Sequence, residues 1–193
     1  PHQHNPVGLL RRPEWRGRLP IIALSGLLSS IAFEPGGFFG GFFATRQLHF
    51  PPFWVSAVLF TSAPLAVPGY LLGGWLSDRF GRRIPGSVFW ALASVFAAIT
   101  YSGLPAAYWA GNATWTFMDG AASPITSAWF GELFPTRARA TASAIGAVAA
   151  AMGGIVGLQL VGRMEPGFGL GPSLGLLTVA AFRGALLLRF LRA

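Results

Sequence analysis

Long blocks of apolar residues, separated by short charged segments, constrain this chain more than any other feature. A helix that crosses a bilayer needs about 20 mostly apolar residues, and blocks of that length follow one another along the sequence. Hydrophobic residues make up 53% of the chain and charged residues 10%, whereas soluble domains carry roughly 25% charged residues. So few charges cannot cover a water-facing surface. The sequence therefore predicts an all-helical protein that crosses a membrane several times.

Six of the apolar blocks are long enough to be membrane-spanning helices. We predict these helices over residues 19–45, 54–77, 84–104, 105–130, 140–161 and 168–188. Residues 19–192 would form one six-helix domain, preceded by a polar, arginine-rich cytoplasmic linker over residues 1–18. The linker does not resemble a signal peptide, which has a short apolar core and a cleavage site. Because residue 1 is a proline, we expect the sequence to start within a longer protein.

The basic residues are all arginine and lie mainly on one side of the predicted helices. Four precede the first helix, three follow the second, two follow the fourth and two end the chain, whereas Arg46 and Arg163 lie on the other side. Arginine-rich loops stay in the cytoplasm. We therefore expect a multi-pass protein of the plasma (inner) membrane with both termini cytoplasmic. The arginines do not gather on one polar face, so the net charge of +8 does not indicate nucleic-acid binding.

Little in the sequence favours an enzyme. The chain has no cysteine, which excludes disulfides, thiolate metal sites and catalytic thiols. An intramembrane serine protease needs a histidine base, but His2, His4 and His49 lie outside the predicted helices. A phospholipid-synthesising transferase needs paired metal-binding aspartates, and Asp119 stands without a second one. No metal or organic cofactor is implied.

Two charged segments carry the most specific information. Residues 74–83 read G-W-L-S-D-R-F-G-R-R and end one apolar block in a tight charged turn, where Gly81 permits a sharp reversal. Residues 131–141 read G-E-L-F-P-T-R-A-R-A-T and place Glu132 at the end of the fourth predicted helix.

The first segment resembles the signature loop of the major facilitator superfamily of membrane transporters. The second resembles the segment between the tenth and eleventh helices of its sugar-porter-like and metabolite:proton symporter members. Both segments stand in the order, and on the membrane side, of the loops after helices eight and ten of that twelve-helix fold. The resemblance covers nearly the whole chain. It implies the C-terminal six-helix half of a transporter whose N-terminal six-helix half is missing from this sequence.

The resemblance also implies a function for the charged residues. Asp78, Arg82, Glu132 and Arg139 would form a cytoplasmic charge network that latches one conformation during alternating access. The remaining residues of the conformational switch would be Gly74, Arg79, Gly81, Arg83 and Arg137. The alternative is that these arginines set the topology and pair with local acidic groups.

The substrate implied is a small polar metabolite, and coupling to protons is expected. Sugar porters carry a glutamine pair in the helix that matches the first one here, where residues 23–30 contain no glutamine. Ser127 stands where those relatives have a tryptophan. An organic acid therefore fits at least as well as a sugar. A drug:proton antiporter and a half-transporter remnant that transports nothing stay open as alternatives.

Three ionisable residues fall inside predicted helices: Glu34, Asp119 and Arg183. A charge inside a membrane is costly, and therefore marks a functional candidate. Glu34 precedes Pro35-Gly36-Gly37, where we expect the helix to break. The resemblance places Glu34 and Asp119 in helices that line the central cavity, as groups for proton coupling or substrate binding. Alternatively, each carboxyl group could bond to backbone groups freed at a kink.

Two further residues of the fourth predicted helix are substrate candidates. Asn112 and Trp115 offer an amide and a ring face, which suit both sugars and aromatic acids. Arg183 would extend its apolar stem to the membrane interface, or the last helix would be shorter than predicted. Glycine pairs at 36–37, 40–41, 73–74 and 153–154, the last followed by Gly157, predict close packing of helices.

Overall fold

The computed structural model describes residues 17–190, which form helices joined by short connections. Most of the predicted linker, with Arg11, Arg12 and Arg16, lies outside the described residues, as does Arg192. The helices of the described range are α3 (Arg18–Arg46), α4 (Pro52–Ser62), α5 (Ala66–Phe80), α6 (Arg83–Thr100), α7 (Pro105–Glu132), α8 (Thr136–Phe168) and α9 (Leu170–Leu187). A short 3₁₀ turn, Ala63–Leu65, joins α4 to α5, and another, Leu188–Phe190, follows α9.

The observed helices lie close to the predicted ones, and they differ most in α8. This helix was predicted over 140–161 but extends over Thr136–Phe168. Its first turn is polar, so hydropathy alone assigns that turn to a loop. The helix begins directly after Pro135 and ends before Gly169, whose φ of 80° interrupts the helical backbone. The true ends of α8 therefore depend on backbone geometry rather than on apolar content.

Five helices of the described range are long and apolar enough to cross a membrane. They are Arg18–Arg46, Pro52–Phe80, Arg83–Thr100, Thr136–Phe168 and Leu170–Phe190. The sixth predicted span, α7, is 28 residues long, but it is not one of the five. Its hydropathy is lowered by polar residues such as Asn112 and Asp119. The fold is thus all-helical and compatible with a multi-pass membrane protein.

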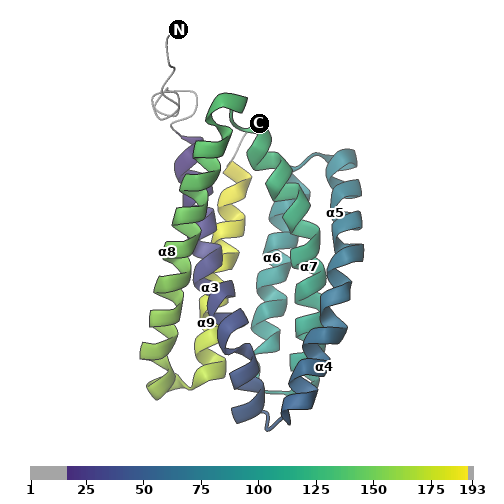
Figure 1. The fold of residues 1–193 in the computed structure, drawn as a ribbon, viewed down its shortest axis with the longest axis vertical. Helices are drawn as coiled ribbons and strands as arrows, with labels where there is room; N and C mark the ends of the chain where they lie inside the picture. Colours follow the sequence, from purple (N-terminus) through teal and green to yellow (C-terminus); the bar gives the residue numbers. More distant parts are fainter. Residues whose placement is uncertain (1–16, 191–193) are drawn as a thin grey trace.

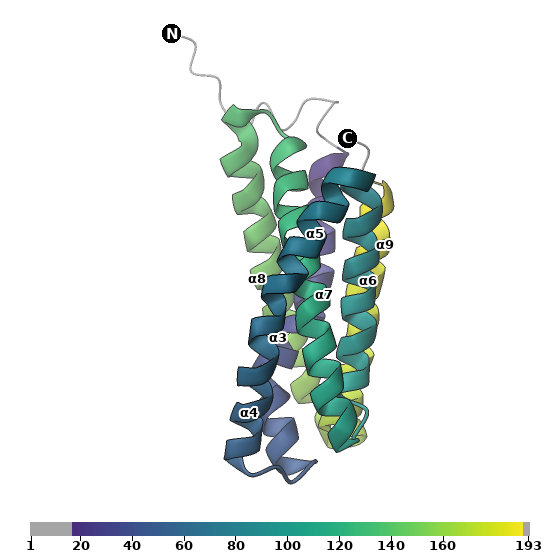
Figure 2. The same ribbon diagram turned by 90° about the vertical axis from the view of Figure 1, so that its right-hand side faces the viewer.

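The helices form two groups that lie side by side (Figure 1). In one group α3 packs against α8 and α9, and in the other α7 packs against α5 and α6. Contacts between α6 and α9 join the two groups. Figure 2 shows α4 and α5 as one continuous rod along α7. Few contacts connect α7 with α8, although they follow each other in the sequence.

Glycines set the closest helix approaches, as the sequence predicted for some of them. A Cβ atom at Gly153 or Gly157 of α8 would collide with the carbonyl oxygen of Leu27 or Ile31 of α3. Similarly, Gly73 of α5 lies against the backbone of α7. Gly37 and Gly74, the second members of their pairs, take no part in these contacts, since an added Cβ there would meet no atom within 4 Å. Which member of a glycine pair faces a neighbour depends on the rotation of its helix.

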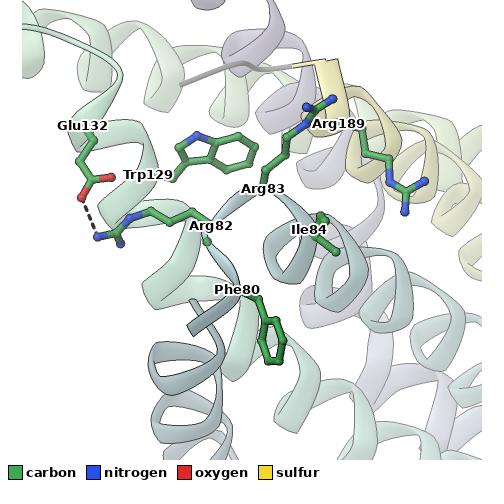
Figure 3. Close-up of a pocket in the computed structure, with 8 residues that line it drawn as sticks. Phe80, Arg82, Arg83, Ile84, Trp129, Glu132 and Arg189 are labelled. Atoms are coloured by element: carbon green, nitrogen blue, oxygen red, sulfur yellow. Dashed lines mark ion pairs between the residues drawn. The ribbon is translucent and has the colours of Figure 1, made fainter. Parts of the chain in front are cut away.

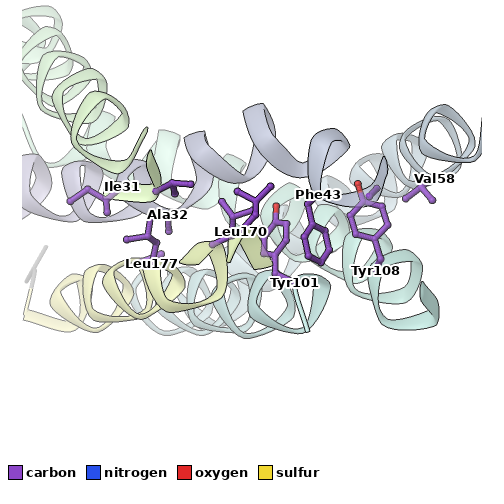
Figure 4. Close-up of a cluster of buried hydrophobic side chains, with 12 residues drawn as sticks. Ile31, Ala32, Phe43, Val58, Tyr101, Tyr108, Leu170 and Leu177 are labelled. Atoms are coloured by element: carbon purple, nitrogen blue, oxygen red, sulfur yellow. The ribbon is translucent and has the colours of Figure 1, made fainter. Parts of the chain in front are cut away.

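An aromatic cluster holds α3, α6 and α7 together at the end where α3 leads into α4 (Figure 4). Phe43 is fully buried and packs edge-to-face on Tyr101, with ring centroids 5.5 Å apart. The Tyr108 hydroxyl donates a hydrogen bond of 3.1 Å to the carbonyl oxygen of Gly40. This bond fixes the C-terminal part of α3 to α7. The predicted break after Glu34 is wrong, because α3 stays helical through Pro35.

Candidate functional site

Most of the described arginines gather at one end of the bundle, which we call the arginine-rich end. Here α3, α6 and α8 begin, and α5, α7 and α9 end. It carries Arg18, Arg79, Arg82, Arg83, Arg137, Arg139 and Arg189. Arg46 and Arg163 lie toward the opposite end. The separation of the arginines predicted from the sequence is thus present in the folded bundle.

The predicted tight turn lies at this end. α5 stops at Phe80, Gly81 follows with φ 77° and ψ 170°, and α6 begins at Arg83. Backbone in this region is open almost exclusively to glycine, so the sharp reversal predicted at Gly81 is confirmed. Asp78 is exposed in the last turn of α5. Arg79 lies over the rings of Trp75 and Phe80, at 5.5 and 5.7 Å.

One ion pair is found within residues 17–190, and it joins the two charged segments. The guanidinium of Arg82 lies 2.6 Å from a carboxylate oxygen of Glu132 (Figure 3). Their side chains are 29% and 57% exposed, so water reaches both. The turn after α5 is therefore tied directly to the end of α7.

The other residues of the expected charge network are not paired with each other. Within the part of the chain that the structure describes, neither Asp78 nor Arg139 takes part in an ion pair. Arg139 lies near the α7 end, with its aliphatic stem beside Gly131. Arg137 is exposed in the first turn of α8. Gly74 faces open space on α5.

A cavity of about 630 Å³ opens beside the ion pair (Figure 3). It combines cationic and apolar walls: Phe80, Gly81, Arg82, Arg83, Ile84, Trp129, Glu132 and Arg189. Arg189 and Trp129 were not predicted to be part of this site. Arg189 was counted only as one of the two arginines that end the chain. No sequence signal reveals that the end of α9 lies beside the turn between α5 and α6.

The two carboxylates predicted inside the membrane both lie near the middle of long helices and are exposed. Glu34 lies on the side of α3 that faces α8, where its Cγ is 3.0 Å from a Cβ built on Gly154. Asp119 lies on α7. Neither forms a hydrogen bond or ion pair within residues 17–190. The backbone-bonded alternative for Glu34 and Asp119 therefore has no support in this conformation.

Aromatic rings connect α3, α6 and α7 near these carboxylates. Phe33 stacks on Trp115 and packs against Trp90, with centroid distances of 5.6 and 5.5 Å. The indole nitrogens of both tryptophans are buried and have no hydrogen-bond acceptor. Asn112, one turn from Trp115, is 8% exposed. Trp90 and Phe33 were not predicted, since nothing in the sequence pairs them with Trp115.

A second cavity, of about 390 Å³, lies between α3, α7 and α8. Small residues dominate its walls, and no charged side chain lines it. The residues are Ile22, Gly26, Ser127, Phe130, Phe134, Ala142, Ser143, Gly146, Ala147 and Ala150. The sparse contact between α7 and α8 leaves this space open.

Arg183 lies one turn before the end of α9 and is exposed. An interfacial position of its guanidinium stays a prediction. His49, with φ 55°, lies in the connection after α3. His2 and His4 are outside the described residues.

No protein-family model matches this chain, and no curated protein matches it. The class of protein follows from the fold. It is an all-helical bundle with five described helices able to cross a membrane, compatible with a multi-pass membrane protein.

Proposed function

We propose that this bundle is half of a secondary active transporter of the major facilitator type. It would move a small polar metabolite, an organic acid or a sugar, by alternating access and in symport with protons. The observation that carries the proposal is the ion pair between Arg82 and Glu132. It connects the two segments on which the resemblance rests, although 50 residues of sequence separate them.

The pair has the properties that a conformational latch requires. A latch must open in every transport cycle, so its contacts must be weak individually. Exposed ion pairs contribute about 0.2–1 kcal/mol, and both side chains here are in contact with water. Opening the pair would free the turn at Gly81 from the end of α7. Asp78 and Arg139 would join the network in the other conformation.

Glu34 and Asp119 would couple protons to transport. Both lie at mid-helix and lack a partner in the described range. A carboxylate in this position can bind a proton or a cationic substrate group at modest cost, because no existing salt bridge must break. The cavity itself would form against a second six-helix bundle, supplied by another part of a longer chain or by another molecule.

The second cavity favours one alternative. Its walls are apolar or hydroxyl-bearing and uncharged, which suits a lipophilic compound better than a sugar or an acid. A drug:proton antiporter is therefore the second candidate. It differs from a symporter in the direction of proton movement relative to the substrate.

The proposal is tested in proteoliposomes that contain the chain, without and then with a second six-helix bundle, and that enclose a pH-sensitive dye. Adding sugars, organic acids and lipophilic compounds in turn identifies which class moves protons, and in which direction. Glu34→Gln should abolish pH-gradient-driven uptake while sparing substrate exchange. Glu165→Gln, which removes an exposed carboxylate near the end of α8, is the matched control.

Each outcome is informative. Uptake driven normally in Glu34→Gln would remove Glu34 from the coupling mechanism. Proton movement opposite to the substrate would favour the antiporter. If no solute moves, even when a second six-helix bundle is supplied, the chain is a remnant and the transporter proposal is wrong.

A further inference from the structure

The cavity at the arginine-rich end has an unbalanced positive charge. Arg82 is neutralised by Glu132, which is the acidic residue among those lining the cavity. Arg83 and Arg189, from the start of α6 and the turn after α9, have no ion-pair partner within residues 17–190. Both line the cavity without a countercharge of their own, so an anion bound there would be attracted to both.

The rest of the cavity wall is apolar. Phe80 and Ile84 are 62% and 61% exposed, and they flank the turn that forms one wall. Trp129 is 2% exposed and provides a buried indole. Figure 3 shows the Phe80 ring lying away from the Arg82–Glu132 pair. A ligand that fills this cavity must therefore offer an anionic group to the arginines and an apolar group to Phe80 and Ile84.

The position of the cavity along the helices suits one source of such a ligand. Arg83 is the first residue of α6, and Arg189 lies beyond the last residue of α9. In a protein whose helices cross a bilayer, helix ends lie at the depth of the lipid headgroups. Basic pockets between helices at this depth bind anionic headgroups. Phe80 and Ile84 stand next to this position on the outer surface, where acyl chains begin.

We propose that this cavity binds an anionic phospholipid, with its phosphate held by Arg83 and Arg189 and its acyl chain along Phe80 and Ile84. Arginine is suited to this role because its guanidinium can hold phosphate oxygens with two parallel hydrogen bonds. The proposal does not depend on transport. It requires a bilayer and this cavity, and it would hold equally for a half-bundle that moves no solute.

Native mass spectrometry of the full chain in detergent micelles tests the proposal. The chain is titrated with phosphatidylglycerol, with phosphatidylcholine and with soluble glycerol 3-phosphate. We expect phosphatidylglycerol to bind at least about tenfold more tightly than either of the others. The two controls separate an anionic lipid from a zwitterionic lipid and from a free phosphate ester.

The double variant Arg83→Gln/Arg189→Gln should lose about 30-fold in affinity for phosphatidylglycerol, since each arginine near an anionic lipid contributes about fivefold. The matched control is Arg46→Gln/Arg163→Gln, which removes two arginines from the opposite end. It should bind phosphatidylglycerol within about twofold of the unaltered chain. If the first variant does not fold, Arg189→Gln alone carries the test, with about a fivefold loss.

Three results would overturn the proposal. In the first, the Arg83 and Arg189 variants bind phosphatidylglycerol as tightly as the unaltered chain does. In the second, the unaltered chain binds phosphatidylcholine as tightly as phosphatidylglycerol. In the third, it binds glycerol 3-phosphate as tightly as phosphatidylglycerol. The last would mean that a soluble phosphate ester, rather than a lipid, occupies the cavity.

Discussion

At the residue scale, a few residues specify the backbone conformation and the charge pairing at the arginine-rich end. Gly81 adopts a conformation that other residues avoid, and Arg82 directly after it reaches Glu132 of α7. The turn therefore has two functions: it reverses the chain direction, and it places the Arg82 guanidinium beside Glu132 of α7. Each function can be removed separately.

Replacing Gly81 with alanine should destabilise the bundle by about 1–3 kcal/mol, because a Cβ atom is strained at φ 77° and ψ 170°. The control is Gly74→Ala in the interior of α5, where no atom lies within 4 Å of the new Cβ. Alanine favours helix over glycine there by up to about 1 kcal/mol. Thermal unfolding followed by tryptophan fluorescence measures both. Equal melting temperatures for the two variants would contradict the strained turn.

The ion pair between Arg82 and Glu132 should show a small coupling energy, of about 0.2–1 kcal/mol, because both partners are exposed. A double-mutant cycle with Arg82→Gln and Glu132→Gln measures it in unfolding experiments. The coupling should fall as salt is raised. Arg79→Gln with Glu132→Gln is the control cycle, with no coupling expected. A coupling above about 2 kcal/mol would be too strong for a latch that opens easily.

At the scale of helices, small residues determine which elements touch. The α3–α8 contact uses Gly153 and Gly157, and the α5–α7 contact uses Gly69 and Gly73. Backbone atoms approach at these positions, which side chains would prevent. In a membrane the hydrophobic effect does not drive helices together, so close packing of this kind provides much of the stability.

Gly157→Ala should lower the melting temperature, because the new Cβ would collide with the Ile31 carbonyl oxygen and force α8 away from α3. Overpacking of this kind costs typically 1–3 kcal/mol. Gly162→Ala is matched on the same helix, where nothing lies within 4 Å, and should be neutral or stabilising. A stability loss in Gly162→Ala as large as in Gly157→Ala would show that helix propensity, not contact, decides the effect.

At the scale of the whole molecule, α7 differs from the other long helices. It is the one long helix within residues 17–190 that is not apolar enough to be a candidate span. Yet its 28 residues would cover about 42 Å at 1.5 Å per residue, and α5 and α6 pack against it. Polar residues such as Asp119 can be carried across a bilayer by a helix whose apolar neighbours cover the rest of its surface.

Cysteine labelling tests the sixth crossing and the orientation together. The chain contains no cysteine, so single cysteines at Ser102, before α7, and at Thr136, after it, can be labelled selectively. Both positions are exposed. In intact cells, a membrane-impermeant maleimide should label Ser102→Cys, and should label Thr136→Cys only after permeabilisation, because the positive-inside rule predicts a cytoplasmic position for the arginine-rich end. Labelling of both in intact cells would mean that α7 does not cross.

Much of the fold follows from the sequence because the relevant signals are local. Apolar blocks of sufficient length predict helices, and the arginines between them mark one end of the bundle. The turn at Gly81 was predictable for the same reason, since it needs one residue type at one position. By contrast, the predicted break at Pro35 did not occur: α3 is helical through that residue and packs against α8 and α9.

The sequence by itself determined the helical class, the helix order and the separation of the arginines. The tertiary structure alone decided which side chains meet. Glu132 pairs with Arg82 rather than Arg139, Arg189 joins the turn between α5 and α6, and Phe33 packs against Trp90 and Trp115. The physical reason is that hydropathy and turn preference belong to short segments. Contacts between distant residues depend on how each helix is rotated and how deeply it is packed, and this emerges from all the helices together.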